Sequence, residues 1–430
     1  VRRRVRLKPD IQTPPASQNS GIHRGHSLTP GLGHKIPTPL NRYLRAAAVS
    51  VSSSAVIFEE VPTAGGQRIG VARLNPEKSR SSLTLEMIDL LGERLPAWAV
   101  DPNIVLVMLE GAGERAFCAG ADLLKLHAAC LAHRESPQRT DIRANGYALD
   151  FFAREYRLDY LIHTYPKPIL CWGHGVVMGG GMGLMAGASH RVVTGEVRIA
   201  MPEINIGLYA DVAGSWFLAR APGRTGLFLA LTAAQLGAAD ALFAGFADYH
   251  ISHARKTVLM ETLIAHAWHR EVAGNRRDLS RLLQSFSEPR AEAGPLRENF
   301  DLINELCRSE DPAAIIHRIT SLASDNEWLQ RASATLAAGS PTTAVLSIAL
   351  QRRLKLASLA EVFRAELVAS LACAARHDLA EGIRALLIDK DKQPQWRPAK
   401  VADVTEEWIE GFFTSPWPAA EHPLADLGAR

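Results

Sequence analysis

The sequence predicts an α/β fold in which a mixed core is followed by a region of helices alone. Three observations support this. Short apolar runs alternate with segments of helical period from residue 53 onward, buried strands lead into glycine-rich loops, and the composition becomes helical after His250. Strands that alternate with helices imply βαβ units with right-handed crossovers. We therefore expect an α/β core over residues 53–254 and a helical region over residues 255–430.

The elements of the core follow from their hydrophobic periods. Residues 56–61 and 68–75 are predicted strands joined by a turn at Gly65 and Gly66. Residues 83–98 carry apolar side chains at helical spacing. Further elements follow in chain order: a doubly buried strand at 103–109, an amphipathic helix at 147–163, strands at 168–172 and 190–193, and a helix at 342–356 that Ser340 and Pro341 open as N-cap and N1.

The composition is that of a soluble globular chain. Of 430 residues, 47% are hydrophobic and 22% are charged, and no apolar run approaches the roughly 20 residues that span a bilayer. The net charge of +3 hides an asymmetry, because residues 1–50 carry nine Lys and Arg against Asp10, which leaves the remainder at −5. We therefore expect neither a membrane partner nor a nucleic-acid surface on the folded body.

Residues 1–52 are rich in Pro, Gly, Ser, His and Arg and have no helical or strand period, so they are predicted to be a disordered basic extension. An upstream extension of a bacterial frame would place the protein in the cytoplasm, whereas an organelle leader would place it in the mitochondrial matrix. No apolar segment of a secretory signal follows the arginines. Five scattered cysteines without a C-x-x-C pair favour a reducing compartment.

The strongest local motif spans residues 173–183 (GHGVVMGGGMG). A strand ends there in a loop dense in glycine, and a helix then begins. Free N–H groups at such a helix start stabilise negative charge on a bound oxygen. The alternative is a tight turn that needs positive φ angles. A P-loop is excluded because no Gly-Lys-Ser/Thr follows.

A second loop spans residues 110–122 (EGAGERAFCAGAD) and mimics a dinucleotide fingerprint. We reject that interpretation, because residues 117–120 interrupt the required helix and no acid ends a second strand about 20 residues later. Cys118 lies in this loop, but a small buried cysteine explains it better than a nucleophile.

The third motif is residues 201–214 (MPEINIGLYADVAG), in which Glu203 and Asp211 lie eight residues apart in an apolar segment. Carboxyls among apolar neighbours tend to have a raised pKa and to serve as bases or nucleophiles. Taken alone, each could equally be a solvated loop acid. A nucleophilic serine is disfavoured because the chain has no G-x-S-x-G elbow.

From about residue 55 onward, these three loops resemble in order and spacing the crotonase (enoyl-CoA hydratase/isomerase) superfamily. The resemblance implies a ββα spiral core with a C-terminal helical region. It also implies that Ala121 and Gly180 offer main-chain N–H groups to a thioester oxygen, with Gly120, Asp122 and Gly179 beside them at the substrate. Two such donors suit enolate and tetrahedral intermediates, and losing one costs about 3–4 kcal/mol. Coenzyme A would be part of the substrate, and neither a separate cofactor nor a metal is expected.

The acids favour the subfamily of 3-hydroxyisobutyryl-CoA hydrolases. Hydratases of the superfamily use two glutamates, and the position of one is Gly183 here, whereas Glu203 is retained. By this resemblance Glu203 activates water or attacks the thioester, and Asp211 orients the water or a substrate hydroxyl. Glu155 aligns with a family glutamate near the acyl end of the substrate, although a solvated helix face would also explain it.

The C-terminal string at residues 377–391 also matches these hydrolases, as a helix end and turn that could bring lysines near the coenzyme phosphates. Three positions depart from the family pattern, at residues 81–83 (SSL), 209–210 (YA) and 213–215 (AGS). These departures weaken the prediction of the substrate more than that of the reaction.

We thus expect hydrolysis of a short 3-hydroxyacyl-CoA, such as 3-hydroxyisobutyryl-CoA in valine degradation. A hydratase or isomerase acting on an unsaturated acyl-CoA is the enzymatic alternative. A non-catalytic RNA-binding relative, using the basic N-terminal arm, is the alternative of another class. Small crotonases form trimers and hexamers, so a homo-oligomer is a further hypothesis, although the added helices could replace those contacts.

Overall fold

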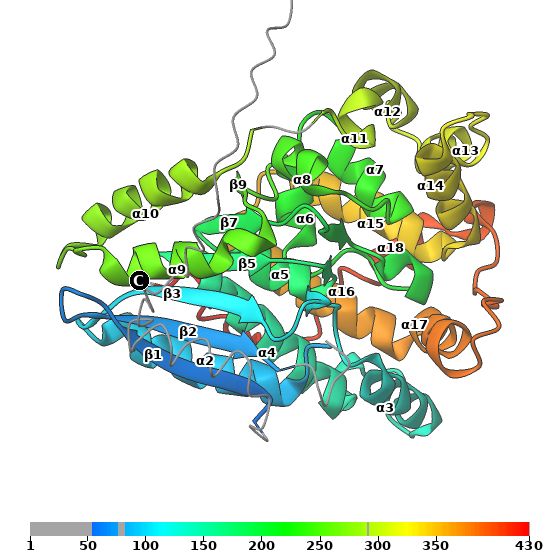
Figure 1. The fold of residues 1–430 in the computed structure, drawn as a ribbon. Helices are drawn as coiled ribbons and strands as arrows, with labels where there is room; N and C mark the ends of the chain where they lie inside the picture. Colours follow the sequence, from blue (N-terminus) through cyan, green and yellow to red (C-terminus); the bar gives the residue numbers. More distant parts are fainter. Residues whose placement is uncertain (1–53, 76–81, 290–291, 430) are drawn as a thin grey trace, which may run out of the picture. The chain divides into compact units, whose positions relative to one another are not determined.

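The computed structural model describes residues 54–75, 82–289 and 292–429, and residues 54–429 belong to one compact unit. The predicted disordered extension at residues 1–52 lies outside the described residues. Within them, the chain builds two sheets and a set of helices around them (Figure 1).

The larger sheet has six strands in the order β1-β2-β3-β5-β7-β9. β1 and β2 are antiparallel, as expected for the two strands joined by the Gly65–Gly66 turn, and the other neighbours are parallel. The bounds of its strands are β1 (Val56–Pro62), β2 (Arg68–Leu74), β3 (Ile104–Gly111), β5 (Ile169–Gly173), β7 (His190–Val193) and β9 (Tyr249–His250). All eight residues of β3 are buried, as the continuous apolar run predicted.

A second sheet of three parallel strands was not predicted from the sequence. It consists of β4 (Ala116–Cys118), β6 (Val176–Met178) and β8 (Arg198–Ala200) in that spatial order. Each of these strands follows a strand of the larger sheet, so the chain repeatedly passes from one sheet to the other and then into a helix or turn. This confirms the expected ββα spiral core. Because the strands are parallel, the loops after their carboxyl ends meet at one edge of the small sheet.

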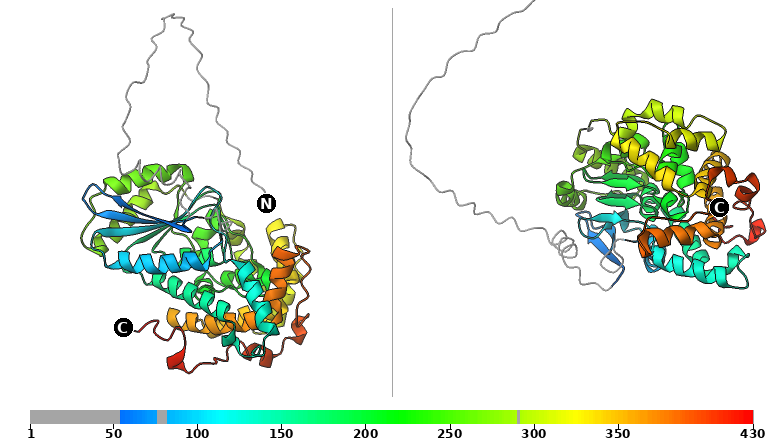
Figure 2. Two further views of the ribbon diagram at one scale, coloured as in Figure 1. Left: turned by 90° about the horizontal axis from the view of Figure 1, so that it is seen from below. Right: turned by 90° about the vertical axis from the view of Figure 1, so that its right-hand side faces the viewer.

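Helices cover both faces of the larger sheet (Figure 2). α9 (Lys256–Ala265) and α10 (Val272–Phe286) pack on one face, where Trp172, Leu259 and Leu283 are buried together. α2 (Leu85–Val100) and α4 (Gly146–His163) lie on the other face, as part of the main hydrophobic core. The other helices of the first part are α3 (Leu123–Glu135), α5 (Gly180–Ala186), α6 (Gly214–Phe217), α7 (Thr225–Thr232) and α8 (Ala238–Ala244).

The second part of the chain is helical, as predicted. The helix expected at 342–356 is confirmed as α15 (Pro341–Arg353), and the Ser340 hydroxyl accepts the N–H of Thr343. The other helices are α11 (Pro295–Glu298), α12 (Phe300–Leu306), α13 (Pro312–Thr320), α14 (Glu327–Ala338), α16 (Leu359–Ala375), α17 (His377–Ile383) with a π-helical turn η5 (Arg384–Ile388), and α18 (Glu406–Glu410).

Among the described residues, no single helix has the length and apolar character to cross a membrane. α14 and α15 satisfy that test only as a pair, and they are bent by 108° relative to each other.

The C-terminal helix α17 packs against the main chain of η2 (Glu203–Ile206), the 3-10 turn that follows β8. A Cβ on Gly382 of α17 would lie 2.5 Å from Ile206 Cα. We predict that Gly382→Ala lowers the free energy of unfolding by roughly 1–3 kcal/mol, because backbone must move to admit the methyl group. Denaturant unfolding measures this.

Gly92→Ala is the matched control, because Gly92 is exposed in α2 and a Cβ there meets nothing within 4 Å. It should stabilise the protein by about 0.5–1 kcal/mol through the higher helix propensity of alanine. Equal effects of the two substitutions would show that α17 does not pack tightly on η2.

Candidate active site

The loops that follow the three strands of the small sheet border one partly open cavity of about 240 Å³. Of the eight residues predicted for the site, seven line this cavity, and Asp122 lines a groove that adjoins it. The seven are Gly120, Ala121, Glu155, Gly179, Gly180, Glu203 and Asp211. The structure therefore brings together residues that are spread over more than 90 positions of the sequence.

The loop after β4 is held by main-chain hydrogen bonds on both sides of Ala121. The N–H of Leu83 donates to Gly120 O at 2.6 Å, and the N–H of Asp122 donates to Leu83 O at 3.0 Å. Gly120 has a φ angle of +103°, which side-chain-bearing residues rarely adopt. The N–H of Ala121 donates to none of the described residues, so it is free to bind an oxygen in the cavity.

The turn after β6 carries Gly179 and Gly180 at the start of α5. Gly179 has a φ angle of +52°, and a Cβ on it would lie 2.8 Å from Glu203 Oε1. A Cβ on Gly180 would collide with Glu155 Oε1. Both carboxyl groups therefore lie against this turn, and only glycine leaves room for them. Within the described residues, the N–H of Gly180 has no hydrogen-bond acceptor.

Glu203 begins η2, directly after β8, and its side chain is 6% exposed. Its Oε2 atom has no hydrogen-bond partner among the described residues. Helix α17 backs this turn, because Gly207, at a φ angle of +70°, packs against the main chain of Asp378. Asp378 itself accepts hydrogen bonds from the Ser340 hydroxyl and the N–H of Arg397.

Asp211 is positioned by residues that the sequence analysis did not single out. The Tyr156 hydroxyl donates to Asp211 Oδ2 at 2.7 Å and lies 2.7 Å from the Ser370 hydroxyl of α16. Glu366, also on α16, accepts the N–H groups of Ala213 and Ser215 at 2.8 and 3.0 Å. Glu366 is an acid in an otherwise apolar stretch of that helix, and this signal in the sequence could have marked it.

Burial dominates the electrostatics of these carboxyl groups. It raises the pKa of Asp211 to about 6, although the hydrogen bond from Tyr156 opposes the shift, and it raises the pKa of Glu366 to about 8. Burial, with the charge of Asp211, also raises the pKa of Glu155 and of Glu203 well above the ordinary value. None of the four forms an ion pair with a described Lys, Arg or His. Such groups suit proton transfer near neutral pH.

A groove of about 720 Å³ adjoins the cavity and shares four lining residues with it, namely Ser82, Ala121, Leu123 and Leu387. Lys125 of α3 and Lys390, which follows η5, border the groove. Among the described residues, no group of three or more His, Cys, Asp or Glu side chains is arranged to hold a metal ion.

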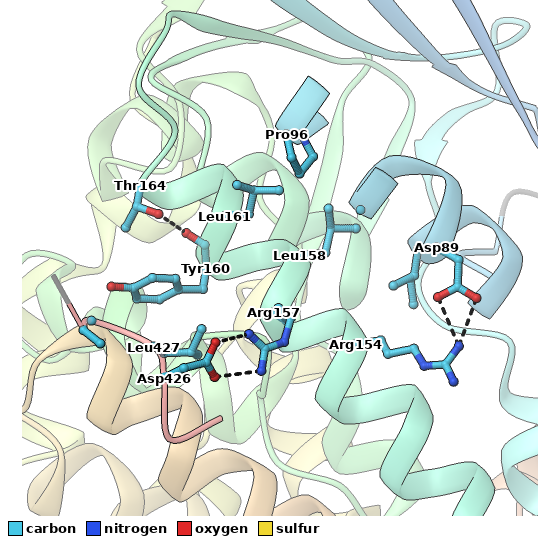
Figure 3. A pocket seen from close by; sticks show the side chains of 14 residues that line it. Asp89, Pro96, Arg154, Arg157, Leu158, Tyr160, Leu161, Thr164, Asp426 and Leu427 are labelled. Atoms are coloured by element: carbon cyan, nitrogen blue, oxygen red, sulfur yellow. Dashed lines mark hydrogen bonds and ion pairs between the residues drawn. The ribbon is translucent and has the colours of Figure 1, made fainter. Parts of the chain in front are cut away.

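A further hollow of about 670 Å³ lies between α2, α4 and the end of the chain (Figure 3). Its charged side chains are already paired, since Arg154 bonds Asp89 and Arg157 bonds Asp426. It contains none of the predicted site residues, and we do not assign it a ligand.

The sequence of the chain matches known proteins over most of its length. The model of the enoyl-CoA hydratase/isomerase family matches residues 69–413. A curated relative named mitochondrial 3-hydroxyisobutyryl-CoA hydrolase, from Danio rerio, is 34% identical over 85% of this chain and 91% of its own. The relative of the same name from Homo sapiens is 34% identical over 80% of this chain and 86% of its own.

Two solved structures share the fold. One, described as a carnitinyl-CoA dehydratase from Mycobacterium thermoresistibile, has a TM-score of 0.73 and 35% identity, over 85% of this chain and 97% of its own. The other, described as an enoyl-CoA hydratase from Rhodobacter sphaeroides, has a TM-score of 0.72 and 32% identity, over 84% and 98%. With the converging loops and the ββα core, these matches show that the chain belongs to the enoyl-CoA hydratase/isomerase family, and so to the crotonase superfamily.

Proposed function

We propose that the protein hydrolyses the thioester of a short 3-hydroxyacyl-CoA, with 3-hydroxyisobutyryl-CoA as the expected substrate. The observation that carries this proposal is that Glu203, the retained glutamate of the hydratase pair, lies against the Gly179–Gly180 turn, while the position of the other glutamate of that pair is Gly183. The names of the curated relatives support the same reaction.

In the proposed mechanism, the N–H groups of Ala121 and Gly180 bind the thioester oxygen and stabilise the charge that develops on it. Glu203 either takes a proton from water, whose oxygen then attacks the carbonyl carbon, or attacks that carbon itself to form an anhydride, which water then hydrolyses at the acyl carbon to release the acid and regenerate the Glu203 carboxylate. When the C–S bond breaks, its electron pair goes to sulfur, which takes a proton and leaves as free thiol. The oxygen of water ends in the carboxylic acid. Asp211, held by Tyr156, orients the water or the substrate hydroxyl.

The hydratase alternative meets a steric obstacle. A Cβ on Gly183 would lie 2.6 Å from Val212 Cβ, and Val212 is held in place with a φ angle of +51°. A second catalytic glutamate therefore has no room at this position. The solved structures described as a hydratase and a dehydratase share the fold with this chain. Fold alone does not decide the reaction, whereas the residues of the site do.

The size and lining of the cavity support a short acyl group. Phe151, Phe152, Leu126, Leu208 and Val212 form its apolar wall, and its volume of about 240 Å³ is below that of most drug-sized ligand pockets. The adjoining groove, with Lys125 and Lys390, offers room for the coenzyme arm and cations for its phosphates.

The RNA-binding alternative concerns residues outside the described part of the chain, and salt-sensitive RNA binding that disappears on deletion of residues 1–50 would support it.

The compartment stays a prediction. The curated relatives are named mitochondrial. The two hypotheses from the sequence analysis therefore both stand: the cytoplasm of a bacterium and the mitochondrial matrix.

We predict that Glu203→Gln reduces thiol release from 3-hydroxyisobutyryl-CoA at least about 100-fold, because the amide can neither accept a proton nor attack. A thiol reagent measures the rate. Glu327→Gln, an exposed change on α14, is the control and should leave the rate unchanged. Equal rates of wild type and Glu203→Gln, or loss of a crotonyl-type enoyl absorbance without thiol release, would contradict the proposal.

We predict that activity declines as the pH falls through about 6, because burial raises the pKa of Asp211 to about 6 and its protonation removes a charged acceptor. Tyr156 donates to the charged form and so lowers this pKa. Tyr156→Phe should therefore move the acid limb of the kcat profile upward by about one pH unit. Tyr165→Phe is the control, since the buried Tyr165 hydroxyl donates to Leu95 O instead. An acid limb that Tyr156→Phe does not move would exclude Asp211 as its origin.

We predict that Gly183→Glu creates no hydratase. The new side chain must displace Val212, which should lower the free energy of unfolding by about 1–3 kcal/mol and reduce thiol release. The same change at the exposed Gly92 should leave activity intact. A Gly183→Glu protein that is as stable as wild type and hydrates an enoyl-CoA would show that the steric argument is wrong.

A further inference from the structure

Helix α4 presents three titratable side chains on successive turns, and each faces a glycine of the α5 segment. A Cβ on Gly180 would collide with Glu155 Oε1. A Cβ on Gly183 would lie 3.0 Å from Asp159 Oδ2, and one on Gly187 would lie 2.9 Å from His163 Cδ2. Because these three positions of the α5 segment are glycines, they leave room for the row of Glu155, Asp159 and His163. Glu155, at one end of the row, lines the cavity.

Neither the sequence motifs nor the proposed mechanism uses Asp159 or His163, and of these two Asp159 is the one next to Glu155 in the row. Asp159 is 0% exposed, and neither of its carboxyl oxygens has a hydrogen-bond partner or an ion pair among the described residues. The titratable groups around Asp159 are acids, a thiol and a buried imidazole. They are Glu155 and His163 on α4, Asp211, Glu366 on α16, and Cys118 at the end of β4.

A carboxyl in these surroundings is more stable protonated than charged. Burial raises the pKa of Asp159 well above its ordinary value, and the charges of Glu155, Asp211 and Glu366 raise it further. Burial also lowers the pKa of His163 to about 4, so the imidazole is neutral at pH 7 and supplies no positive charge. A protonated carboxyl carries one O–H donor, and a buried donor needs an acceptor.

Two buried acceptor atoms without a partner among the described residues lie on α4 one helical turn from Asp159, namely Glu155 Oε1 and His163 Nε2, and of these two residues Glu155 acts more strongly on Asp159 through its charge. Glu155 is therefore the favoured acceptor. It lies one helical turn from Asp159, where side chains four residues apart are neighbours, and its Oε1 atom also has no partner among the described residues. A carboxyl beside a carboxylate holds one proton between the two, because both cannot ionise in the same buried space.

We propose that Glu155 and Asp159 form such a pair with one shared proton, and that Asp159 is a positioning residue whose O–H holds Glu155 beside Gly180 at the acyl end of the cavity. The proposal rests on the proposed hydrolase function only for its kinetic consequences. The pair itself follows from the two unpartnered, buried carboxyl groups and their spacing.

Two substitutions separate the donor from the charge. Asp159→Asn keeps a donor but cannot ionise, so its thiol release at pH 7 should stay within about 3-fold of wild type, and its activity should persist to at least as high a pH. Asp159→Leu removes the donor, so kcat should fall by roughly 10- to 100-fold. Asp240→Asn is the control and should leave thiol release unchanged. Asp240 is also buried, but it accepts the main-chain N–H groups of Leu296 and Arg297 and is not part of the row on α4.

A double variant tests whether Asp159 acts through Glu155. In Glu155→Gln protein, adding Asp159→Leu should cause no further loss of kcat, whereas independent roles would multiply the two effects. If Asp159→Leu does not fold, the infrared measurement below still decides. Multiplying effects, or an Asp159→Asn protein as impaired as Asp159→Leu, would overturn the proposal.

Infrared spectroscopy tests the shared proton without any substrate. Wild-type protein at pH 7 should show the C=O stretch of a protonated carboxyl that Asp159→Asn lacks. Wild-type and Asp159→Asn spectra that coincide in this region would refute the pair. A protonated Asp159 in a protein that releases no thiol would instead refute the proposed function and leave the pair standing.

Discussion

The close approach of two main-chain turns at the edge of the small sheet is the constraint on which the site depends. Gly120 and Gly179 both have positive φ angles, and a Cβ on Gly179 would lie 3.5 Å from Gly120 Cα. Gly181 packs as tightly, since a Cβ there would lie 2.7 Å from Cys118 Cβ. The positive φ angles of Gly120 and Gly179 and the short contact at Gly181 require glycine, and the two turns leave the N–H groups of Ala121 and Gly180 without acceptors among the described residues at the wall of one cavity.

The helices of the second half of the chain hold the residues of the site in place through hydrogen bonds and main-chain packing. Glu366 of α16 holds the main chain after Asp211, and Ser370 contacts the tyrosine that donates to Asp211. Asp378 of α17 backs the turn that carries Glu203. The core supplies the proposed oxyanion donors, while the helical region fixes the segments that carry Glu203 and Asp211. Asp211 and Glu366 tolerate burial without a cation because hydrogen bonds replace the ion pair, whereas burial raises the pKa of Glu155 and Glu203 and so favours their neutral forms.

Much of the core could be predicted from the sequence, because its central strands β3 and β5 are fully buried and carry nearly continuous apolar runs. The strands β4, β6 and β8 could not, since three residues carry too little periodic signal. Seven of the eight predicted site residues line the cavity. Most of them could be recognised in the sequence because glycines and acids form dense local motifs there. Tyr156 and Glu366 were missed because the residues that they contact, Asp211 and Ala213, are distant in sequence. Asp159 was missed because a single acid on an amphipathic helix is typical of a solvated helix face.

The most direct test of this account is a crystal structure of the protein with a non-hydrolysable 3-hydroxyacyl-CoA analogue. We expect the acyl oxygen to lie about 3 Å from the main-chain nitrogens of both Ala121 and Gly180, with a Glu203 carboxyl oxygen beside the acyl carbon. An acyl oxygen that contacts neither nitrogen, or that lies on the far side of the cavity from Glu203, would contradict it.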